Sequence, residues 1–173
     1  DGEVWLSGER VSRRPADDVA RIRLRSLGFV FQQFNLLQGL TARENVEMPL
    51  VLGRARADER RRRALAALDR VGLAEHAHKK PRQLSGGQQQ RVAIARAIVT
   101  EPRVVLCDEP TASLDGASGA KVLDLLRAIV REGERAAIVV THDDRVVRIA
   151  DRVLDVADGR ARERRIRSQE DVR

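Results

Sequence analysis

Leu84-Ser-Gly-Gly-Gln-Gln-Gln-Arg91 decides the fold of this chain, together with Val104-Val-Leu-Cys-Asp-Glu-Pro110 about one strand later. The serine and the two glycines predict the start of a helix, where unpaired backbone N–H groups and the positive end of the helix dipole can face an anion. The second stretch predicts an apolar strand that ends in two adjacent carboxylates. One carboxylate suits Mg²⁺, and the other suits a water at a γ-phosphate. The two stretches together predict nucleotide hydrolysis.

Helical patterns dominate the middle of the chain. Thr41 followed by Glu44 predicts a capping box at the start of a helix. The mostly apolar residues 92–99 after the Ser85-Gly86-Gly87 start predict a mostly buried helix. Residues 57–71 predict another helix, and three residues at helical spacing mark its apolar face: Leu65, Leu68 and Val71.

Apolar runs at residues 28–31, 103–107 and 136–141 predict strands. The last two runs are nearly continuous, which is typical of parallel strands covered on both faces. An amphipathic helix that ends at Gly133 lies between them, so this region predicts a right-handed βαβ unit. Residues 22–27 predict a short helix or turn. Hairpins are predicted near both ends of the chain, at the turns Ser7-Gly8 and Asp158-Gly159.

This combination of motifs resembles the ATPase subunit of ABC transporters over about residues 2–160. The resemblance implies an α/β fold with a P-loop NTPase-like core, a parallel sheet and an inserted α-helical subdomain. It implies one ATPase domain at residues 1–160, with the helical subdomain at about residues 38–98 and a basic polar tail at residues 161–173. The strings at residues 31–37, 41–46 and 48–50 are similar to the macrolide-export and lipoprotein-release branch of the family.

No Gly-x-x-x-x-Gly-Lys-Ser/Thr phosphate loop occurs in the 173 residues, although the family carries one upstream of its first helix. The chain begins at Asp1, and its opening resembles the family sequence just downstream of that loop. We therefore interpret the sequence as an N-terminally incomplete copy with half of a nucleotide site. We expect the chain alone to be inactive, and a non-catalytic fragment remains an alternative.

The amino-acid composition argues against some other classes of function. The chain is 42% hydrophobic, enough for a core, and its apolar runs fall far short of the ~20 residues that cross a bilayer. A net charge of +7 comes mainly from arginines at residues 54–63 and 160–173, which could touch anionic lipid or nucleic acid or form a solvated helix face. Aromatic residues are only 2%, so no stacking platform for single strands is present. Cys107, the single cysteine, is predicted to be a small core residue.

The resemblance assigns roles to residues at the ends of the predicted strands. Asp108 matches the carboxylate that holds Mg²⁺ through water, and Glu109 matches the general base that polarises the attacking water. Gln32 resembles the glutamine that meets Mg²⁺ and the water, with Gln33 as its competitor. His142 resembles the histidine that contacts the γ-phosphate. Because parallel strands end at one sheet edge, we expect these groups to meet there.

The resemblance also implies a dimer, because the signature of one subunit serves the ATP held by the other. The matching signature residues are Ser85, Gly86, Gly87 and Gln88. Asp115 resembles the residue of a loop that links the two sites, and it is also a candidate helix N-cap. The expected ligands are ATP and Mg²⁺.

The expected partners are a second ATPase subunit and a transmembrane permease, which places the chain at the cytoplasmic face of the membrane. The apolar segment at residues 46–52 is a candidate permease contact, although an ordinary packed helix explains it too. A nucleic-acid-associated ATPase with an ABC-type head is the alternative. The roughly fifty residues between Gln32 and Ser85 argue against it, because they contain neither long heptads nor zinc-binding cysteines.

Overall fold

The computed structural model describes residues 2–133 and 135–164 of the chain. These residues form two compact units that divide between Thr141 and His142. The first unit contains all the predicted site residues except His142. The predicted basic tail at residues 161–173 begins in the second unit, and from residue 165 onward it lies outside the described residues.

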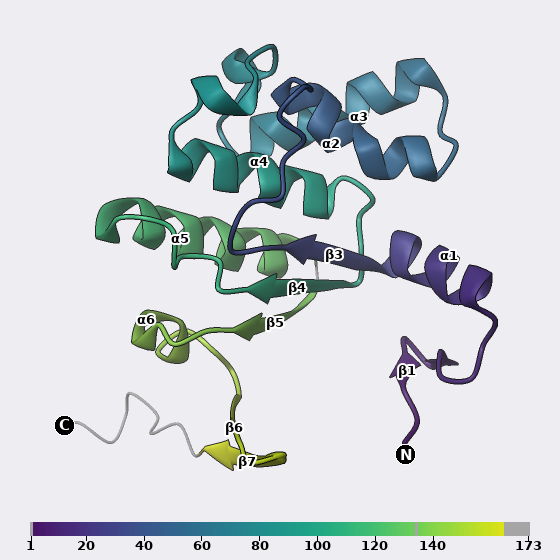
Figure 1. Ribbon diagram of the computed structural model, residues 1–173, viewed down its shortest axis with the longest axis vertical. Helices are drawn as coiled ribbons and strands as arrows, with labels where there is room; N and C mark the ends of the chain where they lie inside the picture. The colour runs from purple at the N-terminus through teal and green to yellow at the C-terminus, as the bar shows by residue number, and fades with distance from the viewer. Residues whose placement is uncertain (1, 134, 165–173) are drawn as a thin grey trace. The chain divides into compact units, whose positions relative to one another are not determined.

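Three parallel strands form the sheet of the first unit: β3 (Leu27–Val30), β4 (Val104–Asp108) and β5 (Ala136–Val140) (Figure 1). Strand β4 is central, with Val30 of β3 aligned to Cys107 and Val140 of β5 aligned to Asp108. The predicted parallel strands are therefore confirmed, with ends within one residue of expectation. All three strands end at the same edge, where the ligand crevices of open α/β sheets lie.

A hairpin and a helix precede this sheet. Strand β1 (Trp5–Leu6) pairs antiparallel with β2 (Glu9–Arg10), which confirms the predicted hairpin. Helix α1 spans Ala16–Ser26 and is longer than the element predicted at residues 22–27. Its first turn is acidic, which suits the positive end of the helix dipole, and the helix buries only Ile22. Because α1 buries one residue, its sequence shows little of the apolar periodicity by which a helix is predicted. The prediction therefore misses the start of α1.

Helices α2 (Ala42–Leu52), α3 (Ala57–Arg70) and α4 (Gly86–Ile98) follow β3, with the short turns η1 (Ala74–His76) and η2 (Pro81–Gln83) before α4. The capping box predicted for α2 is confirmed. The Thr41 hydroxyl accepts a hydrogen bond from the Glu44 N–H at 3.2 Å, and the Glu44 carboxylate accepts one from the Thr41 N–H at 2.8 Å.

The apolar face of α3 differs in part from the prediction. Leu68 and Val71 are buried as expected, whereas Leu65 is 36% exposed. Ala64 and Ala67 are buried instead. Helix α3 packs against both α2 and α4, so its buried face centres on the two alanines and Leu68. Small side chains allow this close packing, and a pattern search for large apolar residues overlooks them.

Helix α4 lies between strand β3 and the pair α2 and α3, as Figure 1 shows. Its side chains from Val92 to Ala95 are fully buried, which confirms the prediction of a buried helix. Helix α5 (Gly116–Glu132) joins the same core and ends at Gly133 as predicted. Cys107 of β4 is also in this core, and burial raises the pKa of its thiol to about 12.

Strand β5 is more exposed than predicted. Ile138 is 57% exposed and Val140 is 62% exposed. Within the described residues β4 is the strand that pairs with β5, so β5 forms an edge of the sheet. The prediction that residues 136–141 are covered on both faces is therefore wrong for the described part of the chain. An apolar run shows that a strand can be buried on both faces. Whether the strand is buried depends on which other segments pack against it.

The second unit contains helix α6 (Asp144–Val147) and the antiparallel hairpin of β6 (Val153–Ala157) and β7 (Arg160–Arg164). This confirms the predicted last hairpin. Ion pairs cross it between Arg152 and Glu163 at 2.8 Å and between Arg164 and Asp155 at 2.6 Å. None of the helices in the two described stretches has the length and apolar character that a membrane span requires.

Candidate functional site

The carboxyl edge of the sheet collects three of the predicted residues. Gln32 follows β3 by two residues, Asp108 is the last residue of β4, and Glu109 comes next. The register of the strands brings these positions side by side, because Val30 is aligned with Cys107. Gln32 and Asp108 are exposed, so both side chains are accessible to a ligand. This edge is the centre of the candidate site.

Glu109 is held in an unusual backbone conformation. Its φ of 44° lies in the left-handed region, which non-glycine residues rarely adopt. The Glu109 N–H donates to the carbonyl of Val140 at 2.8 Å, and the Thr141 hydroxyl donates to the Glu109 carboxylate at 3.1 Å. Strained residues of this kind cluster at functional sites, where the surrounding structure fixes them. Thr141 therefore orients the Glu109 carboxylate from the end of the neighbouring strand β5.

The segment after Glu109 is fastened to its surroundings at two further points. Ser113 donates from its hydroxyl to the carbonyl of Gln32 at 3.1 Å. Gln90 of α4 is fully buried and donates from its side-chain amide to the carbonyl of Pro110 at 2.7 Å. Sequence reasoning assigned no role to Thr141, Ser113 or Gln90. A glutamine inside an otherwise apolar helix is the signal that could have found Gln90, because a buried amide needs a partner.

The signature residues form the first turn of α4. Ser85 is the N-cap: its hydroxyl accepts from the Gln88 N–H at 3.3 Å, and the Gln88 side chain accepts from the Ser85 N–H at 2.9 Å. This capping box leaves the Gly86 and Gly87 N–H groups without a partner among the described residues. A helix start with two such N–H groups is suited to an anion, as the sequence predicts.

Asp115 caps the next helix, α5. Its carboxylate accepts a hydrogen bond from the Ser118 N–H at 2.9 Å, which confirms the predicted N-cap. A Cβ atom placed on Gly87 would lie 3.3 Å from the Cβ of Ser118, so the starts of α4 and α5 pack closely. The signature and Asp115 thus form a second group, which Ser113 connects to the loop of Gln32.

The cap at Asp115 gives a pH-dependent stability. The hydrogen bond from the Ser118 backbone holds the pKa of the Asp115 carboxyl below its usual value. A lowered folded-state pKa stabilises the fold above the unfolded pKa, and this stabilisation is lost as the pH falls below about 4. We expect acid to reduce the melting temperature less in Asp115→Asn than in the unmodified chain.

Thermal unfolding monitored by circular dichroism between neutral and acid pH measures this difference. Asp124→Asn, in the exposed middle of α5, is the matched control and should keep the acid sensitivity of the unmodified chain. Equal acid sensitivity in the Asp115 and Asp124 variants would show that the cap does not titrate with folding.

His142 is the remaining predicted site residue. It is the first residue of the second unit, it follows Thr141 directly in the chain, and it is exposed. Its role stays a prediction from the sequence.

The two oxygen donors at the sheet edge are too few to hold a metal ion by protein ligands alone, but they suit Mg²⁺ that is also bound by phosphate and water. Asp108 offers a carboxylate and Gln32 offers an amide oxygen, both exposed. Mg²⁺ keeps several waters and usually takes one or two carboxylates together with phosphate oxygens of the substrate. Across residues 2–133 and 135–164, no group of three His, Cys, Asp or Glu side chains could hold a metal. The two donors therefore fit a cation that arrives with a nucleotide.

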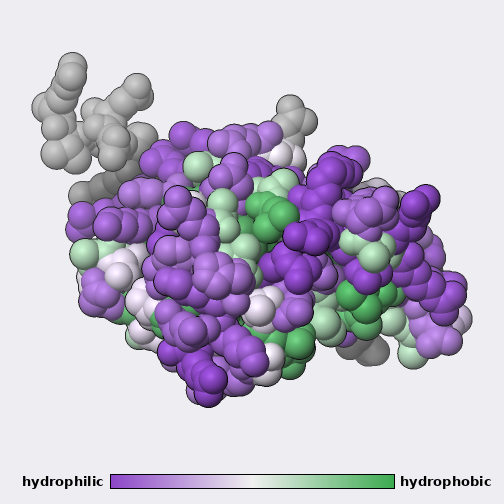
Figure 2. Space-filling view, turned by 90° about the horizontal axis from the view of Figure 1, so that it is seen from above, coloured by the Kyte–Doolittle hydropathy of each residue, from purple (hydrophilic) through white to green (hydrophobic). Residues whose placement is uncertain are grey.

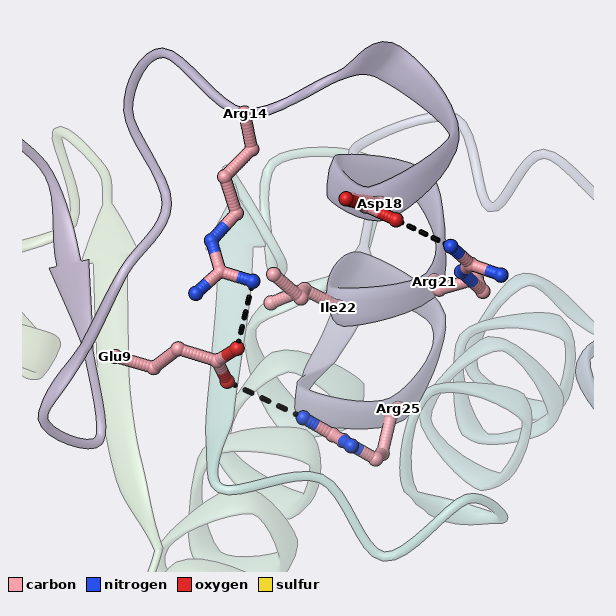
Figure 3. A pocket seen from close by; sticks show the side chains of 6 residues that line it. All are labelled: Glu9, Arg14, Asp18, Arg21, Ile22 and Arg25. Carbon is pink, nitrogen blue, oxygen red and sulfur yellow. Dashed lines mark hydrogen bonds and ion pairs between the residues drawn. The ribbon is translucent and has the colours of Figure 1, made fainter.

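A cavity of about 410 Å³ lies elsewhere, between β2 and α1 (Figure 3). Its charged side chains pair with one another. Glu9 contacts Arg14 at 2.9 Å and Arg25 at 3.4 Å, and Asp18 pairs with Arg21. Because these charges already neutralise one another in part, the cavity is a weaker candidate than the sheet edge.

Comparisons with known proteins show the family to which the chain belongs. The family model described as ABC transporter matches residues 1–112. The ABC transporter ATP-binding protein MJ0796 of Methanocaldococcus jannaschii is 45% identical over 176 residues, which cover 99% of this chain and 75% of that protein. The macrolide export ATP-binding/permease protein MacB 1/2 of Paracoccus denitrificans is 47% identical over 159 residues, which cover 92% of this chain and 24% of that protein. The chain thus spans about a quarter of that longer relative.

A solved structure shows the same fold. It is a dimeric, post-hydrolysis state of the ATP-binding cassette MJ0796 bound to ADP and Pi. It matches 97% of this chain and 75% of its own chain, with a TM-score of 0.85 and 44% identity. The chain therefore belongs to the ABC transporter family and is an ABC-type ATPase domain with relatives of the macrolide-export type.

Proposed function

We propose that this chain is the ATP-binding subunit of a membrane transporter and that it couples ATP hydrolysis at a dimer interface to movements of a permease. The observation that carries the proposal is the convergence of Gln32, Asp108 and Glu109 at the carboxyl edge of the sheet, with the Glu109 carboxylate held by Thr141. The dimeric relative bound to ADP and Pi supports the two-subunit arrangement.

Within the site, Asp108 and Gln32 are the residues that would hold Mg²⁺, with Asp108 acting through water. When bound, Mg²⁺ neutralises charge on the phosphate oxygens. Glu109 is the general base that orients and polarises the attacking water, a role that suits a carboxylate fixed by a hydrogen bond and a strained backbone. For His142, the resemblance to the family is the ground for assigning a contact with the γ-phosphate.

The signature acts across the dimer. The Gly86 and Gly87 N–H groups, together with Ser85 and Gln88, bind the triphosphate held by the opposite subunit. Asp115 lies on the loop that links the two sites, and the closeness of its neighbours Leu114 and Ser118 to Gly86 and Gly87 supports this assignment. The chain acts as one ATPase domain at residues 1–160, with residues 38–98 as its helical subdomain, and residues 161–173 are its basic tail.

The permease docks on the helical subdomain, and the subunit is peripheral at the cytoplasmic face of the membrane. Val46 and Leu50 of the candidate contact segment are buried, so they pack within the core. Leu37, Val51 and Leu52 remain 43% to 67% exposed and are available to a partner. The face drawn in Figure 2 is mostly hydrophilic with smaller apolar patches, which fits a partner of limited apolar contact area.

The proposal is tested by ATP-driven dimerisation. The protein for this test is the chain joined at its N-terminus to a strand, phosphate loop and helix, called the extended chain below, with Glu109→Gln to preserve bound ATP. Sedimentation velocity should show a monomer that becomes a dimer with Mg-ATP. The 173-residue polypeptide should bind ATP weakly and stay monomeric. It contains no phosphate loop, and so it lacks the lysine of that loop that binds the β- and γ-phosphates.

A charged residue in the signature should weaken the dimer. Gly86→Asp places a carboxylate at the helix start, and it should raise the dimer dissociation constant at least about tenfold because it repels the triphosphate. Gly39→Asp is the matched control, since nothing lies within 4 Å of a Cβ at that position. A monomer at saturating ATP, or undiminished dimerisation of Gly86→Asp, would refute the proposed function.

A further inference from the structure

The loop that carries Gln32 has two consecutive residues in a strained conformation. Phe34 has a φ of 59° and Asn35 has a φ of 47°, and neither is a glycine. Two local hydrogen bonds shape the turn, from the Phe34 N–H to the Phe31 carbonyl at 3.2 Å and from the Asn35 N–H to the Gln33 carbonyl at 2.6 Å. Such a conformation persists only where contacts from other parts of the fold fix it.

Arg96 of α4 supplies contacts of this kind. Its guanidinium donates to the Asn35 carbonyl at 2.5 Å and to the Phe34 carbonyl at 2.8 Å. The planar fork of an arginine can satisfy two neighbouring carbonyls at once, whereas the single ammonium of a lysine is a point charge without this geometry. Burial lowers the pKa of Arg96, so the guanidinium is partly removed from water and depends on these two carbonyls.

The same loop also reaches the signature. A Cβ atom placed on Gly86 would lie 3.9 Å from the ring of Phe34 and 3.5 Å from the side chain of Leu114. Gly86 and Arg96 are separated by about 15 Å along the axis of α4, at 1.5 Å per residue. The ring of Phe34 thus lies near the signature end of α4, while its carbonyl is bound by Arg96 from the other end of the helix.

Gln32 itself is fixed through its main chain. Its carbonyl accepts the hydroxyl of Ser113, while its side chain is exposed at the sheet edge. Arg96 and Ser113 therefore hold the loop on both sides of residue 33, one from α4 and one from the loop before α5. A displacement of α4 would therefore shift the backbone of the loop that carries Gln32.

We propose that Arg96 is a positioning residue that ties the Gln32 loop to α4, so that the signature of one nucleotide site and the glutamine of the other move together. This inference rests on the proposed function, in which the signature and Gln32 of one chain serve different nucleotides of the dimer. Arg96 is not one of the residues proposed to contact a nucleotide. It acts through the backbone of Phe34 and Asn35.

The first experiment measures the loop in the 173-residue chain by amide hydrogen exchange. Arg96→Ala should speed exchange at Phe34 and Asn35 by about tenfold or more, because local opening then lacks the two carbonyl bonds that resist it. The exchange rate of Arg96→Lys at these two residues should fall between the rates of Arg96→Ala and of the unmodified chain. The matched control is Arg63→Ala, which removes a guanidinium bond to the Val99 carbonyl at the same end of α4. It should leave exchange at residues 34 and 35 unchanged.

The second experiment measures ATP hydrolysis by the extended chain. Arg96→Ala should lower kcat by about tenfold while KM for ATP changes less than about twofold, the pattern of an interaction that acts on the reaction rather than on binding. The Hill coefficient for ATP should fall toward one, because the coupling between sites weakens. Arg63→Ala should keep kcat and the Hill coefficient of the unmodified protein, at a comparable loss of melting temperature.

The two experiments can overturn the inference in three ways. Unchanged exchange at Phe34 and Asn35 in Arg96→Ala overturns the inference, as does an equal loss of kcat in the Arg96 and Arg63 variants. A change in KM alone also overturns it. If the extended chain without substitutions hydrolyses no ATP, the proposed function fails, and the exchange comparison still decides whether Arg96 holds the loop.

Discussion

Replacing Glu109 with glutamine is expected to lower kcat for ATP hydrolysis by about 10²- to 10⁴-fold in the extended chain, the usual contribution of a general base. Glutamine keeps the size of the side chain and can still accept the hydrogen bond from Thr141, so the fold should be preserved. It cannot take a proton from the attacking water. The binding of ATP should change little, since Glu109 acts on the water rather than on the phosphates.

Phosphate release and equilibrium ATP binding measure the two parts of this prediction. Glu75→Gln is the control for the loss of one negative charge, because Glu75 is exposed in η1 and is not one of the proposed site residues. Hydrolysis that survives Glu109→Gln would show that another group activates the water, and the role of Glu109 would then be wrong.

Replacing Gly28 with alanine is expected to lower the free energy of unfolding by about 3 kcal/mol or more, at the upper end of the range for overpacked cores. Gly28 lies in β3, where this strand meets α4. A Cβ atom at this position would lie 2.2 Å from the carbonyl oxygen of Ala97 and 3.2 Å from the Cγ of Pro102. The nearest atom belongs to the backbone of α4, so a rotamer change cannot relieve the clash, and β3 or α4 must move.

Urea denaturation of the 173-residue chain measures this loss through the midpoint and the slope of the transition. Gly39→Ala adds the same methyl group where nothing lies within 4 Å, and it should change the midpoint little. Since β3 leads directly to Gln32, Gly28→Ala should also reduce ATP hydrolysis in the extended chain. A midpoint equal to that of Gly39→Ala would mean that β3 and α4 adjust at no cost.

The parts of the fold that sequence predicts best are those with local chemical causes. The predicted caps at Thr41 and Asp115 follow from side chains that bond the N–H groups of the next turn, and both are confirmed. The helix start predicted at Ser85 is also confirmed. The strand ends are confirmed because apolar runs stop where polar residues begin. The placement of Gln32, Asp108 and Glu109 at one edge then follows from parallel pairing.

The remaining features depend on contacts between distant segments. The burial of Ala64 in place of Leu65 depends on how α2 and α4 pack against α3, which no local pattern encodes. The exposure of β5 depends on its place at the edge of the sheet. The bonds of Arg96 to the Phe34 and Asn35 carbonyls join residues about sixty positions apart, and the sequence shows only an arginine within an apolar helix.

Cys107 gives the chain a built-in reporter of its own opening. The thiol is 2% exposed in the central strand, next to Asp108, and its raised pKa keeps it protonated at neutral pH. Alkylating reagents attack the thiolate, so they can react only with molecules in which β4 has separated from its neighbours. Because this is the single cysteine of the sequence, one alkylation rate reports how often the sheet opens beside Asp108.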